Sequence, residues 1–357
     1  MTPLIVDIRD AAEFAYGHIE GAVNIPAGGI LTADLPKDRP ILLYCKNGVR
    51  SSEAAGTLRQ MGYDAQAAEG GYVGWVTAHM DNAEITKQAE QSLLKKFRKT
   101  IWCRFTKALN EYQLLQPEDK VAVCISGGKD SMLMAKLFQE LKRHDKFPFS
   151  LEFIVMDPGY SPENRRLIER NAEALSIPIR VFETKIFDSV FHIEKNPCYL
   201  CARMRRGHLY HFAQELGCNK IALGHHYDDV IETILMGMLQ GAQIQTMMPK
   251  LHSTNFEGME LIRPMYLVRE ADICAWRDYN ELRFLQCACH FTETCSTFNE
   301  DGTTPSKRLE TKRLIAELKK TNPFVESNIF RSVENVNVDT VIEYKIKGVR
   351  HNFLDEY

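Results

Sequence analysis

The protein has 357 residues, of which 45% are hydrophobic and 25% charged, and its formal net charge is −3. These values predict a folded protein of about two domains and give no overall sign of a nucleic-acid binder. No run approaches the roughly 20 apolar residues of a membrane span, and the first ten residues do not resemble a secretion signal. We therefore expect a cytoplasmic protein with no membrane partner. Ten cysteines in such a chain indicate catalytic or metal-binding thiols rather than disulfides.

The first eighty residues alternate apolar runs with helical segments. We expect strands over 4–8 and 40–45 and helices over 13–18 and 51–63. Cys45 then lies at the end of a strand and just before the N-terminus of a helix. The helix dipole and the loop N–H groups stabilise negative charge on sulfur at such a place, and Arg50 adds to the effect.

Residues 4–80 resemble a rhodanese domain. The matching segments are DIRDAAEFAYGHIEGAVNIP (7–26), CKNGVRS (45–51) and EGGYVGW (69–75). The resemblance implies that Cys45 carries a persulfide, which the loop amides and Arg50 hold, so these two residues are our catalytic candidates. Asp7 and Arg9 are expected to hold the loop in place.

A basic segment follows the first domain. Residues 86–115 contain seven Lys and Arg but only two Asp and Glu. The polar stretch up to about residue 91 is typical of a linker, and 92–115 reads as one amphipathic helix. Two interpretations of its basic side chains stay open. They form either a solvated face that covers the next domain or a surface for a nucleic-acid backbone.

Residues 121–131, VAVCISGGKDS, predict a buried strand, a glycine turn and the start of a helix. This geometry points backbone N–H groups at an anion. It is not a Walker A loop, because Val123 stands where that loop needs glycine and Asp130 where it needs Ser or Thr. It resembles the SGGxDS loop of the PP-loop ATP pyrophosphatases, which cleave ATP between the α and β phosphates and adenylate a substrate oxygen. The ATP-binding candidates are Ser126, Gly127, Gly128, Lys129, Asp130 and Ser131.

Further strands over 151–157, 177–183 and 220–226 alternate with helices, one of them over 161–175. The pattern predicts an α/β fold with a doubly wound parallel sheet and a ligand at the carboxyl ends of its strands. Carboxylates beside a polyphosphate are suited to Mg²⁺. The candidates at these strand ends are Asp157, Gly224, His225, Asp228 and Asp229.

The cysteines Cys198 and Cys201 form a CxxC motif, and a second group lies at Cys287, Cys289 and Cys295. Such a pair of groups predicts a metal centre. Two assignments stay open on the residues alone. One is a closed zinc site, with His290 available as a fourth ligand. The other is an iron–sulfur cluster on three thiolates, which leaves one iron open.

Residues 93–338 resemble the tRNA 2-thiocytidine synthetase family. The matching segments are VAVCISGGKDS, PCYLCARMRRGHLY, IALGHHYDDVIETILMGMLQG, MMPKL and IRPM. The resemblance implies a four-iron four-sulfur (4Fe-4S) cluster and a reaction that adenylates O2 of an anticodon-loop cytidine of tRNA and replaces it by sulfur. It places the cluster on Cys198, Cys201 and Cys287, with Cys289 as the alternative because CxC stands here where many members have CxxC. We expect the remaining cysteines to pack in cores: Cys103, Cys124, Cys218 and Cys274.

Together these observations predict an ATP-dependent sulfurtransferase that uses ATP, Mg²⁺ and a 4Fe-4S cluster. The expected domains are a rhodanese-like domain over 1–85, a linker over 86–92, a PP-loop thiolation domain over 93–338 and a C-terminal tail over 339–357. Its expected partners are tRNA and a cysteine desulfurase or another sulfur donor, and a homodimer stays open. The alternatives are an enzyme that moves sulfur on a free base or small metabolite and a non-catalytic iron–sulfur redox sensor.

Overall fold

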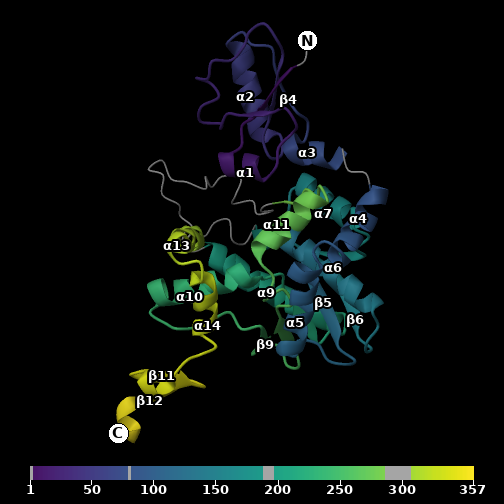
Figure 1. Cartoon of the computed structure of the whole chain (residues 1–357). Coiled ribbons are helices and arrows are strands. Elements are labelled where there is room, and N and C mark those ends of the chain that lie inside the picture. The colour runs from purple at the N-terminus through teal and green to yellow at the C-terminus, as the bar shows by residue number, and fades with distance from the viewer. Residues whose placement is uncertain (1–2, 79–81, 188–196, 286–306) are drawn as a thin grey trace. The chain divides into compact units, whose positions relative to one another are not determined.

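The computed structural model describes residues 3–78, 82–187, 197–285 and 307–357 (Figure 1). The chain divides into two compact units, one of residues 1–227 with 249–299 and one of 228–248 with 300–357. Among the helices of these described ranges, none is both long and apolar enough to cross a membrane.

The N-terminal part of the first unit is a four-stranded sheet in the order β2-β1-β3-β4, and all its strands are parallel. Its core is formed by alternate side chains of β1 and β3, such as Val6 and Leu43, which are fully buried. Helices α1 and α2 connect strands of this sheet, and α3 follows its last strand. The elements are β1 (Leu4–Asp7), α1 (Ala11–Tyr16), β2 (Val23–Asn24), β3 (Ile41–Tyr44), α2 (Val49–Gln60), β4 (Ala65–Ala67) and α3 (Gly71–Ala78).

The larger sheet has six strands in the order β7-β6-β5-β8-β10-β9, and only β9 is antiparallel to its neighbour. From β5 the chain proceeds to β6 and β7 on one side and then returns to β8 on the other, so the carboxyl end of β5 is a switch point, where ligands bind in such sheets. This confirms the predicted doubly wound sheet. The strands β9 and β10 were not predicted, because three-residue strands give too short a pattern to recognise. The strands are β5 (Lys120–Ile125), β6 (Ser150–Asp157), β7 (Ile179–Glu183), β8 (Lys220–Ala222), β9 (Lys250–His252) and β10 (Glu260–Ile262).

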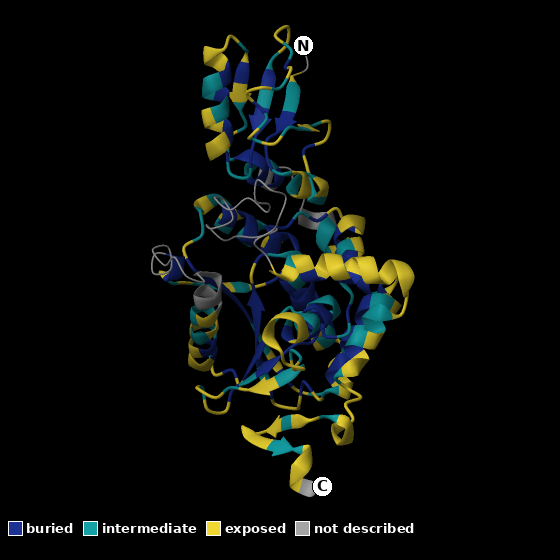
Figure 2. Ribbon diagram, turned by 90° about the vertical axis from the view of Figure 1, so that its left-hand side faces the viewer, coloured by how far each residue is buried: buried dark blue, intermediate teal, exposed yellow. Residues whose placement is uncertain are grey.

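Helices cover this sheet, and its central strands are the most buried part of the unit (Figure 2). Val121, Ala122 and Val123 of β5 are completely buried, as a parallel strand covered on both faces requires. The helices are α6 (Lys129–Arg143), α7 (Pro162–Ala174), α9 (Pro197–Glu215), α10 (Tyr227–Gly241), which runs into the second unit, and α11 (Glu270–Tyr279).

The basic segment differs from its prediction. Instead of a linker followed by one helix over 92–115, the chain forms α4 (Asn82–Leu94), a π-helical turn η1 (Arg98–Trp102) and α5 (Cys103–Glu111). The stretch 86–92 lies inside α4, where Ala89 is completely buried. In the π turn the Trp102 amide bonds to the Phe97 carbonyl. This wider turn changes the helical phase, so the buried stripe passes through Trp102 into α5.

The second unit contains the helices α13 (Lys307–Thr321) and α14 (Val325–Ser332). The stretch 339–357, expected to be a tail, contains a hairpin of β11 (Glu343–Ile346) and β12 (Val349–Asn352). Its two-residue turn has positive φ at Lys347 and Gly348, as a tight hairpin turn requires. Short 3-10 turns flank it, η2 (Val338–Thr340) and η3 (Phe353–Glu356). The domain limits themselves stay a prediction.

Candidate functional site

Cys45 directly follows β3, and α2 begins four residues later. Its Sγ accepts hydrogen bonds from the Gly48 amide at 3.2 Å, the Ser51 amide at 3.4 Å and the Ser51 hydroxyl at 3.5 Å. The side chain is only 1% exposed. The loop therefore surrounds the sulfur with donors, which stabilise a negative sulfur. The Ser51 hydroxyl is a donor that the sequence analysis did not single out, although it ends the CKNGVRS segment.

Close packing fixes this loop. Gly48 has a φ of +93°, which a residue with a side chain rarely adopts. A Cβ on Gly71, the first residue of α3, would lie 2.5 Å from the Cys45 carbonyl oxygen, so only glycine fits there. Asp7 and Arg9 form a buried, bidentate ion pair, and Arg9 also donates to the Gly17 carbonyl at 2.7 Å. Their contacts are those of a structural pair.

Arg50 lies on the first turn of α2 and is exposed. It is not among the donors that the structure places around the Cys45 sulfur. Its role toward a persulfide remains a prediction from the resemblance.

The ATP-loop candidates lie together at the switch point, between β5 and α6. The Ser131 hydroxyl accepts from the Ser126 amide at 3.1 Å and donates to the Gly128 carbonyl at 3.0 Å, which closes the turn. Gly128 is the N-cap of α6, and no side chain caps the first amides of this helix. These amides and the positive end of the helix dipole are therefore available to a phosphate group.

Two glycines make the loop compact. Gly127 has a φ of +84°, and a Cβ there would lie 2.5 Å from Ile168 of α7. A Cβ on Gly224, two residues after β8, would lie 3.2 Å from the Ser131 amide nitrogen. Gly224 thus brings the end of β8 against the start of α6, as expected for a part of the same site.

Lys129 and Asp130 carry the charge of the loop. The Lys129 Nζ lies 3.0 Å from Asp130 Oδ1 and 3.3 Å from Glu270 Oε1 of α11. Burial acts to lower the pKa of Lys129, but the two carboxylates outweigh it and raise the pKa, so this amine is positively charged. His226 Nε2 lies 3.8 Å from Asp130 Oδ1. Sequence reasoning missed Glu270, because no local motif links it to a loop 140 residues away.

The carboxylates predicted for Mg²⁺ are held differently from one another. Asp157 is buried, and its Oδ1 accepts from the Gly159 amide at 2.9 Å and the Tyr160 amide at 2.7 Å, as in a capped turn after β6. Asp228 and Asp229 open α10 in the second unit, where Asp229 forms an ion pair with Arg308. His225 is partly buried between Gly224 and α10.

The comparisons with known proteins agree with both resemblances. Residues 73–290 match the PP-loop domain family, and residues 1–78 match the Rhodanese-like domain family. A tRNA-cytidine(32) 2-sulfurtransferase from Coxiella burnetii is 32% identical over 252 residues, which are 70% of this chain and 94% of the relative. Another, from Syntrophotalea carbinolica, is 31% identical over 261 residues, 72% of this chain and 95% of the relative. This chain belongs to the tRNA-cytidine(32) 2-sulfurtransferase family.

A solved structure supports the fold of the same region. A U34-tRNA thiolase from Methanococcus maripaludis, determined with its 4Fe-4S cluster, aligns with a TM-score of 0.52 and 22% identity. The alignment covers 70% of this chain and 82% of the thiolase. The predicted α/β fold and the prediction of a sulfurtransferase enzyme are thus confirmed.

Of the predicted cluster ligands, the structure describes only the backbone of Cys198 and Cys201. Cys198 and Cys201 are on α9, three residues apart in the sequence. Their side chains, and all of Cys287 and its alternatives, lie outside the described residues. Within the ranges that the structure describes, no three His, Cys, Asp or Glu side chains form a metal-binding group.

The four cysteines expected in cores differ in how far they are buried. Cys124 and Cys218 are buried as predicted, and burial raises the pKa of the Cys218 thiol to about 11. For Cys103 the prediction is wrong, because the π turn before it rotates its side chain to the surface, where it is exposed. Cys274 on α11 is only partly buried.

Helix α1 contacts α11 within the first unit. The Arg277 guanidinium of α11 lies 4.2 Å from the centre of the Tyr16 ring. Burial raises the pKa of Tyr16, while a hydrogen bond to Arg277 and the charge of Lys129 act against it. Burial also raises the pKa of Glu13. The positive charges of Arg9, Lys46 and Arg50 act in the opposite direction, and the last two belong to the segment 45–51. Positive charges of the Cys45 loop and of the ATP loop thus both act on side chains of α1.

Proposed function

We propose that the protein uses ATP to replace O2 of a tRNA cytidine by sulfur, and that Cys45 supplies this sulfur. The observation that carries the proposal is the pairing, in one chain of this family, of a nucleotide loop with uncapped amides and a cysteine whose sulfur is surrounded by donors. The first is built to hold a polyphosphate and the second to hold a negative sulfur.

In the first step, the cytidine O2 attacks the α-phosphorus of ATP, and pyrophosphate leaves. The amides of Gly127 to Ser131 and the Lys129 amine hold the phosphates. Bound Mg²⁺ would neutralise charge on the departing pyrophosphate, and Asp157, which belongs to the same unit as the ATP loop, would hold it there. The product is a base with AMP on O2, which makes this oxygen a good leaving group.

In the second step, sulfur forms a bond to C2 and AMP leaves. Cys45 receives sulfane sulfur from a cysteine desulfurase or another donor and holds it as a persulfide. A sulfane sulfur is two electrons more oxidised than the sulfur of the product, so this route also consumes a thiol reductant. Free sulfide already has the required oxidation state and needs none.

Cys198, Cys201 and Cys287 would hold the 4Fe-4S cluster. Support comes from the helical spacing of the first two and from the order of the motifs in the family resemblance. When bound, the cluster supplies one iron without a protein ligand, to which sulfur can attach. The residues of the chain then have to bring O2 of the cytidine to the ATP loop and exclude water from the adenylated base.

Mass spectrometry of tRNA nucleosides from cells with and without the gene tests the function. We expect 2-thiocytidine to disappear without the gene and to return with the wild-type copy. Unchanged thionucleosides would reject tRNA as the substrate and favour the small-metabolite alternative. ADP and phosphate as products, in place of AMP and pyrophosphate, would reject adenylation.

Metal analysis of anaerobically purified protein tests the cluster. We expect about four irons per chain and their loss in Cys198→Ala and Cys201→Ala. A comparison of Cys287→Ala with Cys289→Ala identifies the third ligand. Stoichiometric zinc, with no iron recoverable after reconstitution, would reject the cluster.

A further inference from the structure

We infer that a lysine-rich hollow beside α4 binds the phosphate backbone of the tRNA substrate. The sequence left two interpretations open for the basic side chains of this segment, and this is one of them. The hollow has a volume of about 500 Å³. We call it the lysine hollow, and it is lined by Lys87, Gln88, Gln91, Ser92, Lys95, Lys96 and Tyr279. This inference rests on the proposed function for the identity of the nucleic acid.

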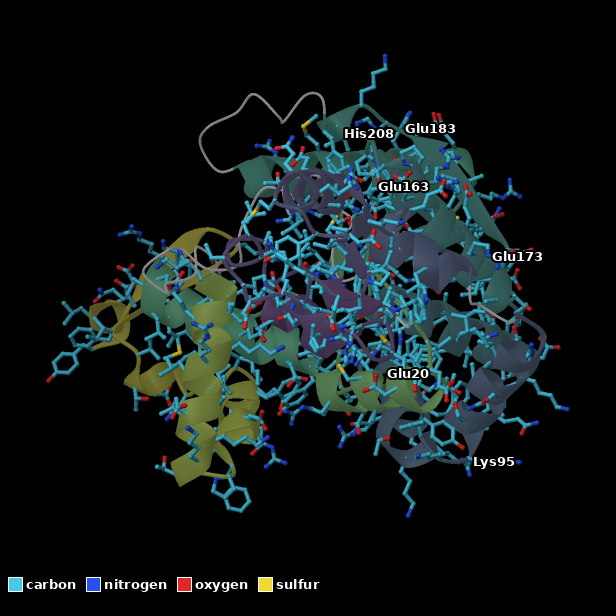
Figure 3. The ribbon with its side chains drawn as sticks, turned by 90° about the horizontal axis from the view of Figure 1, so that it is seen from above. Glu20, Lys95, Glu163, Glu173, Glu183 and His208 are labelled. Carbon is cyan, nitrogen blue, oxygen red and sulfur yellow. The ribbon has the colours of Figure 1, made fainter. Side chains whose placement is uncertain are left out.

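The charge of the lysine hollow is one-sided. Three of its seven lining residues are lysines and none is acidic. Lys87, Lys95 and Lys96 are exposed, and Lys95 lies at the edge of the molecule in Figure 3. A solvated face that merely covers a domain usually alternates its charges, whereas a run of unbalanced cations attracts a polyanion.

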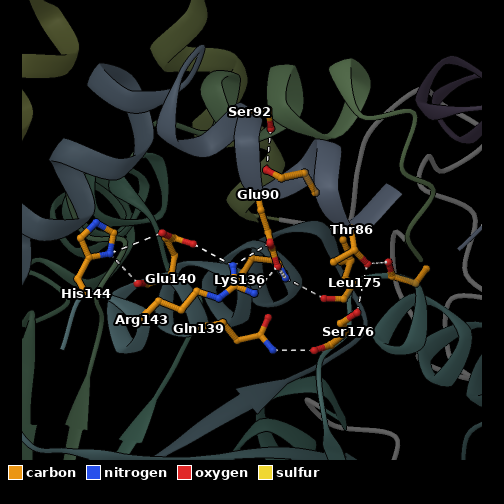
Figure 4. A network of polar contacts seen from close by, with 12 residues as sticks. Thr86, Glu90, Ser92, Lys136, Gln139, Glu140, Arg143, His144, Leu175 and Ser176 are labelled. Atoms are coloured by element: carbon orange, nitrogen blue, oxygen red, sulfur yellow. Dashed lines mark hydrogen bonds and ion pairs between the residues drawn. The ribbon is translucent and has the colours of Figure 1, made fainter. Parts of the chain in front are cut away.

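Three carboxylates of α4 and α11, among the side chains that the structure describes, each pair with a cation outside the lysine hollow. Glu90, on the same helix, lies 2.7 Å from the buried Lys136 amine and 2.7 Å from Arg143 (Figure 4). On α11, Asp272 pairs with Arg104 and Asp278 with Arg277. The positive charge of the lysine hollow is therefore available to a ligand.

The floor of the lysine hollow is rigid. The Gln88 side chain donates to the Tyr279 carbonyl at 3.1 Å, and Asn280 donates to the buried Ser92 hydroxyl at 3.1 Å. Phe97 packs edge-on against the Tyr279 ring, with their centres 5.8 Å apart. A preformed surface loses little conformational entropy when it binds a ligand.

The spacing of the cations favours a strand of phosphates over a single small anion. Lys87 and Lys95 are eight residues apart, which is about 12 Å along a helix axis. Cations spread over this length can contact successive phosphates of one nucleic-acid strand. Tyr279 adds a half-exposed aromatic ring next to the Lys96 amine, which lies 3.8 Å from the ring centre. Cations interleaved with an aromatic ring are the pattern by which proteins hold RNA strands and unstacked bases.

The test is the affinity of the full-length protein for tRNA as a function of salt concentration. The variant replaces Lys87, Lys95 and Lys96 by Gln. Because each lost phosphate contact changes the slope of log K against log salt by about 0.7 to 0.9, we expect the slope to become shallower by about 2 to 3. At low salt the affinity should fall at least about 30-fold.

Two further variants make the result specific. The control replaces Lys345, Lys347 and Arg350 of the exposed C-terminal hairpin by Gln, which removes the same charge, and it should bind tRNA like the wild type. Tyr279→Leu keeps an apolar contact with Phe97, and we expect it to weaken binding several-fold with an unchanged salt slope.

An unchanged slope in the lysine variant, or an equal loss in the hairpin control, would overturn the inference. So would a preference of the lysine hollow for anionic vesicles over tRNA. These outcomes differ from a failure of the proposed function, in which the wild-type protein would neither bind nor thiolate tRNA.

Discussion

The Cys45 loop and the ATP loop are two versions of one local structure. Each follows a parallel strand, turns at a glycine with positive φ and opens a helix: Gly48 has a φ of +93° and Gly127 of +84°. They differ in what their amides face. In the Cys45 loop, two amides donate to a sulfur of the chain itself. In the ATP loop, no side chain caps the first turn of α6.

This difference shows how one geometry serves two kinds of chemistry. Where the chain supplies its own anionic group, the turn is filled and the sulfur is buried. Where the anion is a ligand, the amides stay open, and the charged residues Lys129 and Asp130 pair with each other. Four predictions test the comparison, from the largest expected effect to the smallest.

The largest effect should come from Asp130→Ala. This change removes the carboxylate 3.0 Å from the Lys129 amine, so this cation is no longer held in place at the phosphate site. We expect thiolation to fall by about 100-fold or more with every sulfur donor, as when a positioned electrostatic group is removed from an active site. The measurement is the rate of AMP and 2-thiocytidine formation, with iron content as the control for folding. Activity near that of the wild type would show that the ATP loop is not the reaction site.

The second largest loss of thiolation activity should come from Cys45→Ala, and it should depend on the sulfur donor. With thiosulfate or a desulfurase, we expect thiolation to fall at least about tenfold, because no persulfide forms. With free sulfide at high concentration, activity should be largely retained. Cys103→Ala, which removes an exposed thiol elsewhere, is the matched control. If Cys45→Ala equalled the wild type with every donor, the N-terminal domain would be a docking module and not a sulfur carrier.

Glu90→Gln tests the ion pairs by which α4 is held on α6, the helix that begins at the ATP loop. Burial acts to raise the pKa of Glu90, but Arg143 and Lys136 outweigh it, and the pKa lies below its ordinary value of 4.5. The charged form therefore stabilises the fold fully above about pH 4.5, and this stability is lost as the pH falls through the lowered pKa.

At pH 7 we expect Glu90→Gln to cost about 2 kcal/mol in unfolding free energy, since it leaves the buried Lys136 without its counter-charge. The cost should shrink below about pH 4, where the wild-type carboxyl is also protonated. Urea unfolding at several pH values measures this. A cost that does not depend on pH would show that packing, and not charge, holds α4 on α6.

The smallest effect should come from Ser51→Ala, which removes a hydroxyl shared between the Cys45 sulfur at 3.5 Å and the Gly48 carbonyl at 3.0 Å but leaves both amides. One hydrogen bond of about 1 kcal/mol corresponds to an approximately fivefold loss in persulfide formation. Ser52→Ala is the matched control, because that hydroxyl donates only to the Gly48 carbonyl at 2.8 Å. Equal losses in the two variants would mean that loop geometry, and not a bond to sulfur, is responsible.

Local sequence was sufficient for both loops. Each requires a strand, a glycine turn and a helix within about a dozen residues, and their physical signals are local: β-branched runs, glycine pairs and helical periodicity. The positions of Cys45 and of Ser126 to Ser131 were therefore predictable, as was the parallel sheet that carries them.

Tertiary structure decided what depends on residues far apart in the sequence. The pairing of Lys129 with Glu270 joins helices 140 residues apart, and the clamp of Glu90 on Lys136 joins α4 to α6. The π turn at Arg98–Trp102 broke the expected single helix, because the buried stripe of α4 and that of α5 are out of phase. A sequence pattern reports which residues avoid water, but the partners that they and the buried charges find are set only when distant segments pack together.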